Sequence, residues 1–380
     1  MEVDLRLLGG YILSKKCNKE CNKKTSIGGQ ALIEGIMMRG PKKTAMAVRN
    51  LDGEIILERW ETETLCKAKI ARLPIIRGVI GFISSMVYGY KALMRSAEIA
   101  GLDEVEEELK KEKQAKKEKK RAQKASEDTD TAVDTEHAID AEEATTDESK
   151  DGDKSSSAFT TGLMIVATVL GVVLSIGLFI VLPTFIYNWI SPLFPDSVTQ
   201  NPTLNSLVKS VFEGVLKITI LVGYMLLVSL MKDIRRTFQY HGAEHKTIFC
   251  YEHGKELTVE NVRGERRFHP RCGTSFLILM LLVSIFISFF IDPFFSLIGI
   301  PHLHVAIRAL VKLLLMPLIM GIGYELIKLA GRHDNLFTRI ISAPGVWLQH
   351  VTVLEPTDDM IECAIMAFKE VIPEDESDKF

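Results

Sequence analysis

Cysteine is scarce in this chain, which has six cysteines in 380 residues, spread from Cys17 to Cys363. So few cysteines exclude a small disulfide-rich secreted scaffold. The N-terminus also lacks a basic segment followed by an apolar one, so we expect no signal peptide. The first segment is therefore expected to stay on the side where it was made, where its cysteines remain reduced.

Charge is unevenly distributed along the chain. The mean hydropathy is positive, +0.14, although 25% of the residues are charged. Asp103–Ser157 alone holds 11 Lys and Arg and 19 Asp and Glu, with few apolar residues between them. Such a segment cannot bury enough apolar surface to fold, so we expect a disordered charged linker. A basic helix at Lys110–Lys124 that touches lipid is the functional alternative.

Four apolar stretches predict four transmembrane helices. Phe159–Leu182 contains no charged residue and is long enough to cross about 30 Å of hydrocarbon. The other three stretches are Val211–Met231, Ser275–Ile291 and Val305–Leu329. The first and the last of these three contain charged residues. Those two have an alternative interpretation as buried helices of a soluble domain.

The connections between the apolar stretches predict an orientation. Lys232–Thr274 contains nine Lys and Arg, whereas Ile190–Ser210 contains one and Gly299–His304 none. Because positively charged connections stay in the cytoplasm, we expect Lys232–Thr274 and both termini to be cytoplasmic. The predicted location is the plasma (inner) membrane, and the predicted fold is a four-helix transmembrane bundle with a small α+β cytoplasmic domain.

The N-terminal part of that α+β domain is predicted to contain a β-hairpin. Thr44–Arg49 and Ile55–Trp60 read as strands, and the Asp52-Gly53 pair between them favours a tight turn. Residues 74–97 read as an apolar helix that lies in the membrane interface, inserts partly, or covers the sheet.

The C-terminal part is predicted to complete the same domain. Val346–Leu354 alternates as a strand would, and Thr357 begins a helix that runs to about Val371. The predicted segments are a mobile tail (1–25), a β-hairpin and helix region (26–102), the charged linker (103–157), the four-span region (158–331) with its loop 232–274, and a C-terminal strand and helix (332–380).

A histidine-rich motif follows the second apolar stretch. In Tyr240–Lys246 the order is His-x-x-Glu-His, and on a helix His241 and His245 share one face with Glu244 beside them. Two imidazoles at this spacing can hold one divalent metal ion, for which we expect zinc. The order is the mirrored form of a zinc-protease motif, in which the glutamate is the general base, so Glu244 is the predicted catalytic residue.

A second motif adds candidate ligands. His269 and Cys272 precede the third apolar stretch on the same side of the membrane, and imidazole and thiolate are both zinc ligands. All four ligands together would close the coordination sphere and form a structural site. Three ligands, or a set that includes Glu325, would leave a position for water. Interfacial histidines that bind headgroups or carbonyls are the alternative without a metal. The Cys17–Cys21 pair is interpreted as incidental.

Charged residues within the apolar stretches form a separate group. Glu213 and Lys217, and Arg308 and Lys312, are each four residues apart on one helix face, where they can neutralise each other. With Asp292 they also suit a polar pathway for an ion or solute, which is the basis of a transporter hypothesis.

Three segments together resemble a known family. Gly28–Pro41, Tyr240–Ile248 and His269–Phe276 closely resemble the YqhQ-like bacterial membrane proteins, a family of unknown function labelled as predicted metal-dependent enzymes. The resemblance covers nearly the whole chain except residues 1–24 and the charged linker. It implies that Glu34 and Arg39 work together with the metal motif, and that Glu325 contributes. A structural ion pair is the alternative for Glu34 and Arg39.

The leading hypothesis is a metal-dependent hydrolase in the lipid bilayer that acts on a lipid or a membrane-adjacent peptide. A scaffold or assembly factor with a structural metal site is the first alternative, and the transporter is the second. We expect no nucleic-acid partner, and a homo-oligomer stays open.

Overall fold

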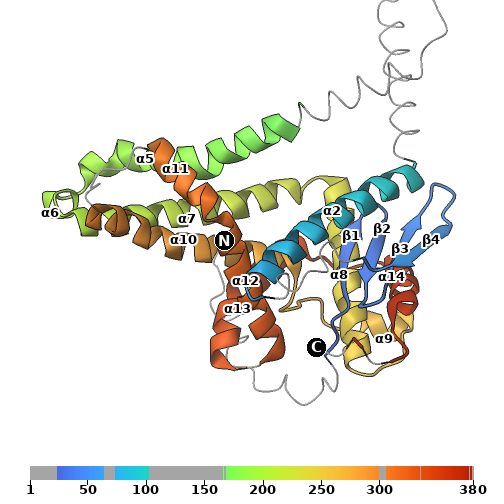
Figure 1. Ribbon diagram of the computed structural model, residues 1–380. Helices are drawn as coiled ribbons and strands as arrows, with labels where there is room; N and C mark the ends of the chain where they lie inside the picture. The colour runs from blue at the N-terminus through green and yellow to red at the C-terminus, as the bar shows by residue number, and fades with distance from the viewer. Residues whose placement is uncertain are drawn as a thin grey trace, which may run out of the picture. The chain divides into compact units, whose positions relative to one another are not determined.

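The computed structural model describes residues 24–63, 73–101, 166, 168–298, 305–333, 335–375 and 377–378 (Figure 1). The charged linker, all but two residues of the N-terminal tail, the Cys17–Cys21 pair and the Gly299–His304 turn lie outside these residues. Contacts divide the chain into one unit of residues 1–101 and 182–380 and a second unit of residues 102–181, each described by itself.

A four-stranded antiparallel sheet, in the order β1-β2-β3-β4, forms the N-terminal part of the described chain. Its strands are β1 (Gly28–Leu32), β2 (Gly35–Arg39), β3 (Lys43–Arg49) and β4 (Ile55–Glu61). The hairpin predicted from the sequence is β3–β4 and is confirmed, although its turn is longer than expected. In that turn the Asn50 side chain accepts a hydrogen bond from the Glu54 amide at 2.8 Å, and Gly53 has a φ of 86°.

Side-chain alternation gives the sheet two covered faces. Ile36, Met38, Ala45 and Ala47 point to one core, which they share with helices α8 (Lys232–Glu252) and α14 (Asp358–Val371). The opposite face contributes Leu32, Met37, Met46 and Val48 to a second core with Ala92 and Ala100. This second core lies against α2 (Ile76–Ile99), so α2 covers the sheet, which is one of the three arrangements left open by the sequence.

The C-terminal segment contains two helices instead of a strand and a helix. The prediction of a strand at Val346–Leu354 is wrong, because α13 spans Leu336–Thr352 and only Val353 and Leu354 lie outside the helix. A capping box starts this helix: the Asn335 side chain accepts from the Thr338 amide, and the Thr338 hydroxyl accepts from the Asn335 amide. The predicted final helix is confirmed as α14, which begins after Thr357.

Three helices are long and apolar enough to cross a membrane: Thr168–Leu193, which includes α5 (Leu182–Ile190), Leu204–Val228 within α7 (Pro202–Val228), and Gly273–Ile291 within α10 (Gly273–Leu297). The predicted fourth span is a pair, α11 (Val305–Leu314) and α12 (Met316–Arg332), bent by 42°. Pro317 lies in the first turn of α12, where its missing N–H favours a new helix start. The described part therefore has three candidate spans, or four if the bent pair counts as one.

Two of these helices share a buried charged cluster. The Glu213 carboxylate on α7 lies 3.8 Å from the Lys217 ammonium and 3.2 Å from the Lys312 ammonium on α11. The Thr184 hydroxyl donates to the other oxygen of the Glu213 carboxylate at 2.8 Å. The predicted proximity of Glu213 and Lys217 is therefore present, and Lys312 extends it across two helices. The single Glu213 carboxylate thus pairs with two ammonium groups, and the transporter hypothesis stays a prediction.

Candidate metal centre

Helix α8 positions the histidine motif. It does not continue the second apolar stretch directly, because Ser229–Met231 separate it from α7. Within α8 the helical period places His241 and His245 on one face, with ring centroids 4.5 Å apart. Gly242 lets this helix approach the extended segment after α13: a Cβ there would lie 2.0 Å from the Leu354 carbonyl oxygen.

Backbone carbonyls orient both imidazoles in the same way. His241 Nδ1 lies 3.0 Å from the Thr352 oxygen, and His245 Nδ1 lies 2.5 Å from the Arg267 oxygen. A carbonyl can only accept, so each Nδ1 carries a proton and, in the neutral ring, each Nε2 presents a lone pair. This tautomer, with Nδ1–H bound to a carbonyl, is the one that metal-ligating histidines use.

Cys272 approaches the histidine side chains from another part of the chain. It directly precedes α10, and its carbonyl accepts the Phe276 amide at 3.2 Å, so its thiol lies at the N-terminal end of that helix. Its Sγ is 3.1 Å from His241 Nε2. The ligand atoms of His241, His245 and Cys272 all lie within 4.8 Å of one another. His245 Nε2 is buried and has no hydrogen-bond partner among the residues described.

The electrostatics of this trio favour a thiolate. Burial alone would raise the pKa of Cys272, but His241 and His245 lower it well below its usual value. Burial would lower the pKa of His241, but the Cys272 sulfur raises it to about 9. A thiolate beside two imidazoles is the donor set that zinc prefers.

Glu244 lies next to the trio in a cavity of about 150 Å³. Its Oε1 accepts a hydrogen bond from the Gly29 amide of edge strand β1 at 3.0 Å. A Cβ on Gly29 would lie 2.9 Å from the Glu244 carboxyl carbon, so a larger residue there would displace the Glu244 side chain. Burial raises the pKa of Glu244 more than the neighbouring histidines lower it. His245 and Cys272 line the same cavity.

His269 lies beside the trio but is bound elsewhere. Its Nδ1 accepts from the Arg271 amide at 3.2 Å, and its Nε2 lies 3.8 Å from a Glu252 oxygen. Burial lowers the pKa of His269 to about 4, so the ring is neutral near pH 7. Burial would raise the pKa of Glu252, but His269 and Arg271 lower it to about 2. The structure thus brings three of the four predicted ligands together and gives His269 a different partner.

The three additional predicted residues lie apart from the trio. Glu34, at the β1–β2 turn, pairs with Arg236. Glu325 on α12 pairs with Arg77 on α2, with 2.6 Å between Glu325 Oε1 and Arg77 Nε. Arg39 lies on the sheet face that points to α2, where it donates to the Ser84 hydroxyl at 3.4 Å. Glu34 and Glu325 therefore each form an ion pair with an arginine.

Several residues that support the site were not among the sequence-predicted ones. The Gln349 side chain accepts from the His269 amide at 2.8 Å and donates to its carbonyl at 2.7 Å, which fixes the loop before Cys272. Glu252 shares the α8 face of His241 and His245, so its position seven residues after His245 was a detectable signal. The roles of the Thr352 and Arg267 carbonyls carry no sequence signal, because every residue has a carbonyl.

Comparisons with known proteins cover most of the chain. A family model described as "Protein of unknown function (DUF1385)" matches residues 73–374, a range that contains the whole trio and Glu244. The uncharacterized protein YqhQ of Bacillus subtilis (strain 168) is 29% identical over 350 residues, which cover 91% of this chain and 92% of the relative. No solved structure matches.

Proposed function

The chain belongs to the DUF1385 family of proteins of unknown function, and we propose that it is a membrane-embedded hydrolase that uses one divalent metal ion, zinc, held by His241, His245 and Cys272. The proposed site lies at the cytoplasmic face of the bacterial inner membrane. The proposed substrate is a lipid or a membrane-adjacent peptide.

One observation carries this proposal: two imidazole Nε2 atoms and one thiol converge in a buried position, and one of those nitrogens has no other partner. An unpartnered buried polar atom costs free energy, on the order of 1–3 kcal/mol. A metal ion would satisfy His245 Nε2 and the Cys272 thiolate together. The carbonyl partners on both Nδ1 atoms fit this role, because they hold the ring nitrogens in the ligating tautomer.

Three protein ligands favour a catalytic site over a structural one. Structural zinc sites have four protein ligands, whereas catalytic sites have three and leave one position for water. His269 is the one further predicted ligand beside the trio, and its nitrogens bind the Arg271 amide and face Glu252. The cavity that Cys272 and His245 line gives the open position access to solvent and substrate.

Glu244 is the proposed general base and acid. A divalent ion bound by the trio would supply Lewis acidity that lowers the pKa of water entering the open position. Glu244 takes the proton of the attacking water and returns it to the leaving group, so the residue ends each cycle in its starting state. The Gly29 amide holds the carboxylate in place, and burial raises the pKa of Glu244, which favours its uptake of a proton.

Packing between distant segments supports four crossings. Strands β1 and β2, which precede every candidate span, contact α8, and α14, which follows every span, contacts α8, β2 and β3. Elements packed into one body lie on one side of a membrane, so the number of crossings before α8 and the number after it are both even. This parity makes α11 and α12 together a crossing, and the nine positive charges of Lys232–Thr274 favour the cytoplasm for the packed body.

Metal analysis of the purified full-length chain tests the proposal. We expect about one zinc per chain in the wild type and a loss of most of it in His241→Ala, His245→Ala and Cys272→Ala. His350→Ala, which changes an exposed histidine, is the matched control and should retain the metal. Equal, substoichiometric metal in all of these proteins would rule the site out.

A His269→Gln variant separates the catalytic from the structural interpretation. With three ligands, His269→Gln keeps at least most of the zinc, because its nitrogens already have other partners. A loss of zinc as complete as in His245→Ala would indicate a closed four-ligand site, and the scaffold alternative would then be preferred.

A further inference from the structure

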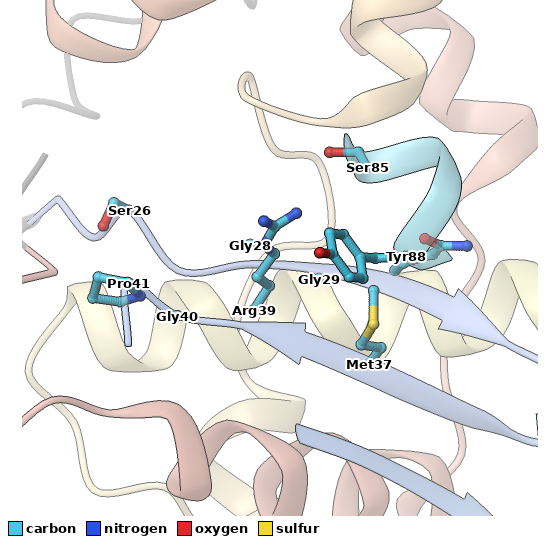
Figure 2. Close-up of a pocket in the computed structure, with 10 residues that line it drawn as sticks. Ser26, Gly28, Gly29, Met37, Arg39, Gly40, Pro41, Ser85 and Tyr88 are labelled. Carbon is cyan, nitrogen blue, oxygen red and sulfur yellow. The ribbon is translucent and has the colours of Figure 1, made fainter. Parts of the chain in front are cut away.

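A second and larger hollow, of about 300 Å³, lies between the sheet and α2 (Figure 2). Its walls come from the start of β1, from β2 with the turn that follows, and from α2. The lining includes Ser26, Gly28, Gln30, Arg39, Ser85 and Tyr88. Its size is at the low end of ligand pockets in proteins, which suits a small polar group.

Arg39 is the charged residue in this lining. It lies directly opposite Gly28 in the β1–β2 register, and the absence of a side chain at Gly28 leaves its guanidinium uncovered. Figure 2 shows the guanidinium close to the Tyr88 ring, from whose centroid it is 5.4 Å away. Lys91 Nζ lies 5.9 Å from the same ring but does not line the hollow, and the Tyr88 hydroxyl donates to the Glu63 carboxylate at 2.9 Å.

The donors of Arg39 are only partly used. One terminal nitrogen, Nη2, donates to the Glu63 carbonyl at 3.1 Å and to the Ser84 hydroxyl at 3.4 Å. Within the residues that the structure describes, Nε and Nη1 have no acceptor and no carboxylate forms an ion pair with the side chain. A half-buried guanidinium without a carboxylate is costly, and a bound anion would offset that cost.

This hollow adjoins the metal cavity. Ser26, Gly28 and Gly29 line both, because β1 is an edge strand with one hollow on each side of it. Gly28 and Gly29 have no side chains, so β1 separates the two hollows by its backbone at these positions. The amide of Gly29 holds Glu244 on the metal side, while Gly28 faces Arg39 on the other side.

We propose that the hollow lined by Arg39, Tyr88 and Ser85 binds a phosphate group, and that this group belongs to the substrate of the neighbouring metal centre. The second half rests on the proposed function, and the first half does not. The guanidinium has free N–H groups on Nε and Nη1, which can donate to phosphate oxygens, and the hydroxyls of Ser26 and Ser85 are further donors at the rim. A phosphate ester held here would place its remaining part beside β1, next to the Glu244 cavity.

The phosphate has two chemical sources, a lipid headgroup or a water-soluble ester. Binding to the purified full-length chain separates them: glycerol 3-phosphate is titrated in detergent, and nanodiscs with phosphatidic acid are compared with nanodiscs whose lipid is neutral diacylglycerol in phosphatidylcholine. We expect saturable binding in one of these arms. Absence of binding in both would overturn the proposal.

Two variants on the adjacent strands β1 and β2 locate the bound group. Arg39→Gln should weaken binding at least tenfold. Gly28→Leu should block it sterically, and the fold should tolerate that change because a Cβ at Gly28 meets no atom within 4 Å. Arg59→Gln, an exposed arginine on β4, is the matched control and should bind as the wild type does. Unchanged binding in both pocket variants would also overturn the proposal.

Zinc content and phosphate binding are measured on the same samples, so the two proposals fail separately. If the wild type holds no zinc but binds phosphate through Arg39, the pocket stands and the hydrolase does not. If the wild type and the pocket variants hold zinc, the ligand variants lose it, and phosphate binding does not depend on Arg39, only the pocket is rejected. A titration of zinc-stripped protein tests whether the phosphate simply binds the metal. Binding that depends on Arg39 should persist in the zinc-stripped protein.

Discussion

At the scale of single residues, a sequence pattern predicts some groups of the site and gives no indication of others. The four-residue spacing of His241 and His245 was sufficient to place them on one face of a helix. Their tautomers are set by the Thr352 and Arg267 carbonyls, which come from distant segments. Cys272 joins them from the segment before α10, in which the Gln349 side chain binds the backbone of His269. The pair was therefore predictable, whereas the choice of Cys272 over His269 required the folded chain.

Zinc should protect Cys272 from alkylation. Its thiol lines a cavity and its pKa is lowered by two histidines, whereas burial raises the pKa of Cys250 and Cys363 to about 11. After treatment with a chelator, N-ethylmaleimide should modify Cys272 well before those two, and added zinc should slow that reaction at least tenfold. Peptide mapping by mass spectrometry measures it. The same rate with and without zinc would count against Cys272 as a ligand.

The buried Glu252 should make the stability of the fold depend on pH. Its pKa is about 2 in the fold and has an ordinary value of 4.5, so its stabilisation is complete above about pH 4.5 and is lost as the pH falls toward 2. The shift corresponds to a stabilisation on the order of 3 kcal/mol. Glu252→Gln should therefore melt well below the wild type at pH 7, and the gap should narrow at pH 3.5. A gap that stays constant over this range would contradict the assignment.

At the scale of elements, the sequence indicated the type of most helices and of the β3–β4 hairpin, and it was wrong about α13. Alternating apolar residues at Val346–Leu354 suggested a strand. The helix forms because Asn335 and Thr338 cap it and because it packs against α10. At Gly345 a Cβ would lie 2.5 Å from Ser275 on α10, a closeness that the periodicity of one segment does not indicate.

Close packing of α8 should be essential for the metal centre. Gly242→Ala pushes a methyl group against the Leu354 carbonyl, which follows the Thr352 carbonyl that orients His241. We expect a destabilisation of about 1–3 kcal/mol and a loss of zinc. Gly223→Ala on α7 meets no atom within 4 Å and should retain both stability and zinc. Thermal unfolding and metal content measure the two variants. Full zinc content in Gly242→Ala would show that this contact does not position His241.

At the scale of the whole molecule, the account predicts an even number of crossings on each side of α8. The sequence predicted four spans from composition, and the structure shows that the last one is a bent pair. Composition could not decide whether that pair crosses or re-enters. The contacts of α14 with α8 and the sheet make crossing the consistent choice, because they join segments separated by all of α10–α13.

Cysteine labelling in intact cells tests this topology. A membrane-impermeant maleimide should label Gln200→Cys, between the first two spans, from outside. Lys255→Cys after α8 and Lys369→Cys on α14 should be labelled only after permeabilisation. All three positions are solvent-exposed in the fold, so equal labelling after permeabilisation is the control. External labelling of Lys369→Cys would mean that α11 and α12 do not cross.

The central claim, that His241, His245 and Cys272 hold one metal ion, is tested most directly by X-ray absorption spectroscopy of the zinc-loaded full-length chain. The account predicts one sulfur at about 2.3 Å, two imidazole nitrogens at about 2.0–2.1 Å and one further light atom. The sulfur contribution should disappear in Cys272→Ser. A spectrum without sulfur, or one that requires three imidazoles, would contradict the account.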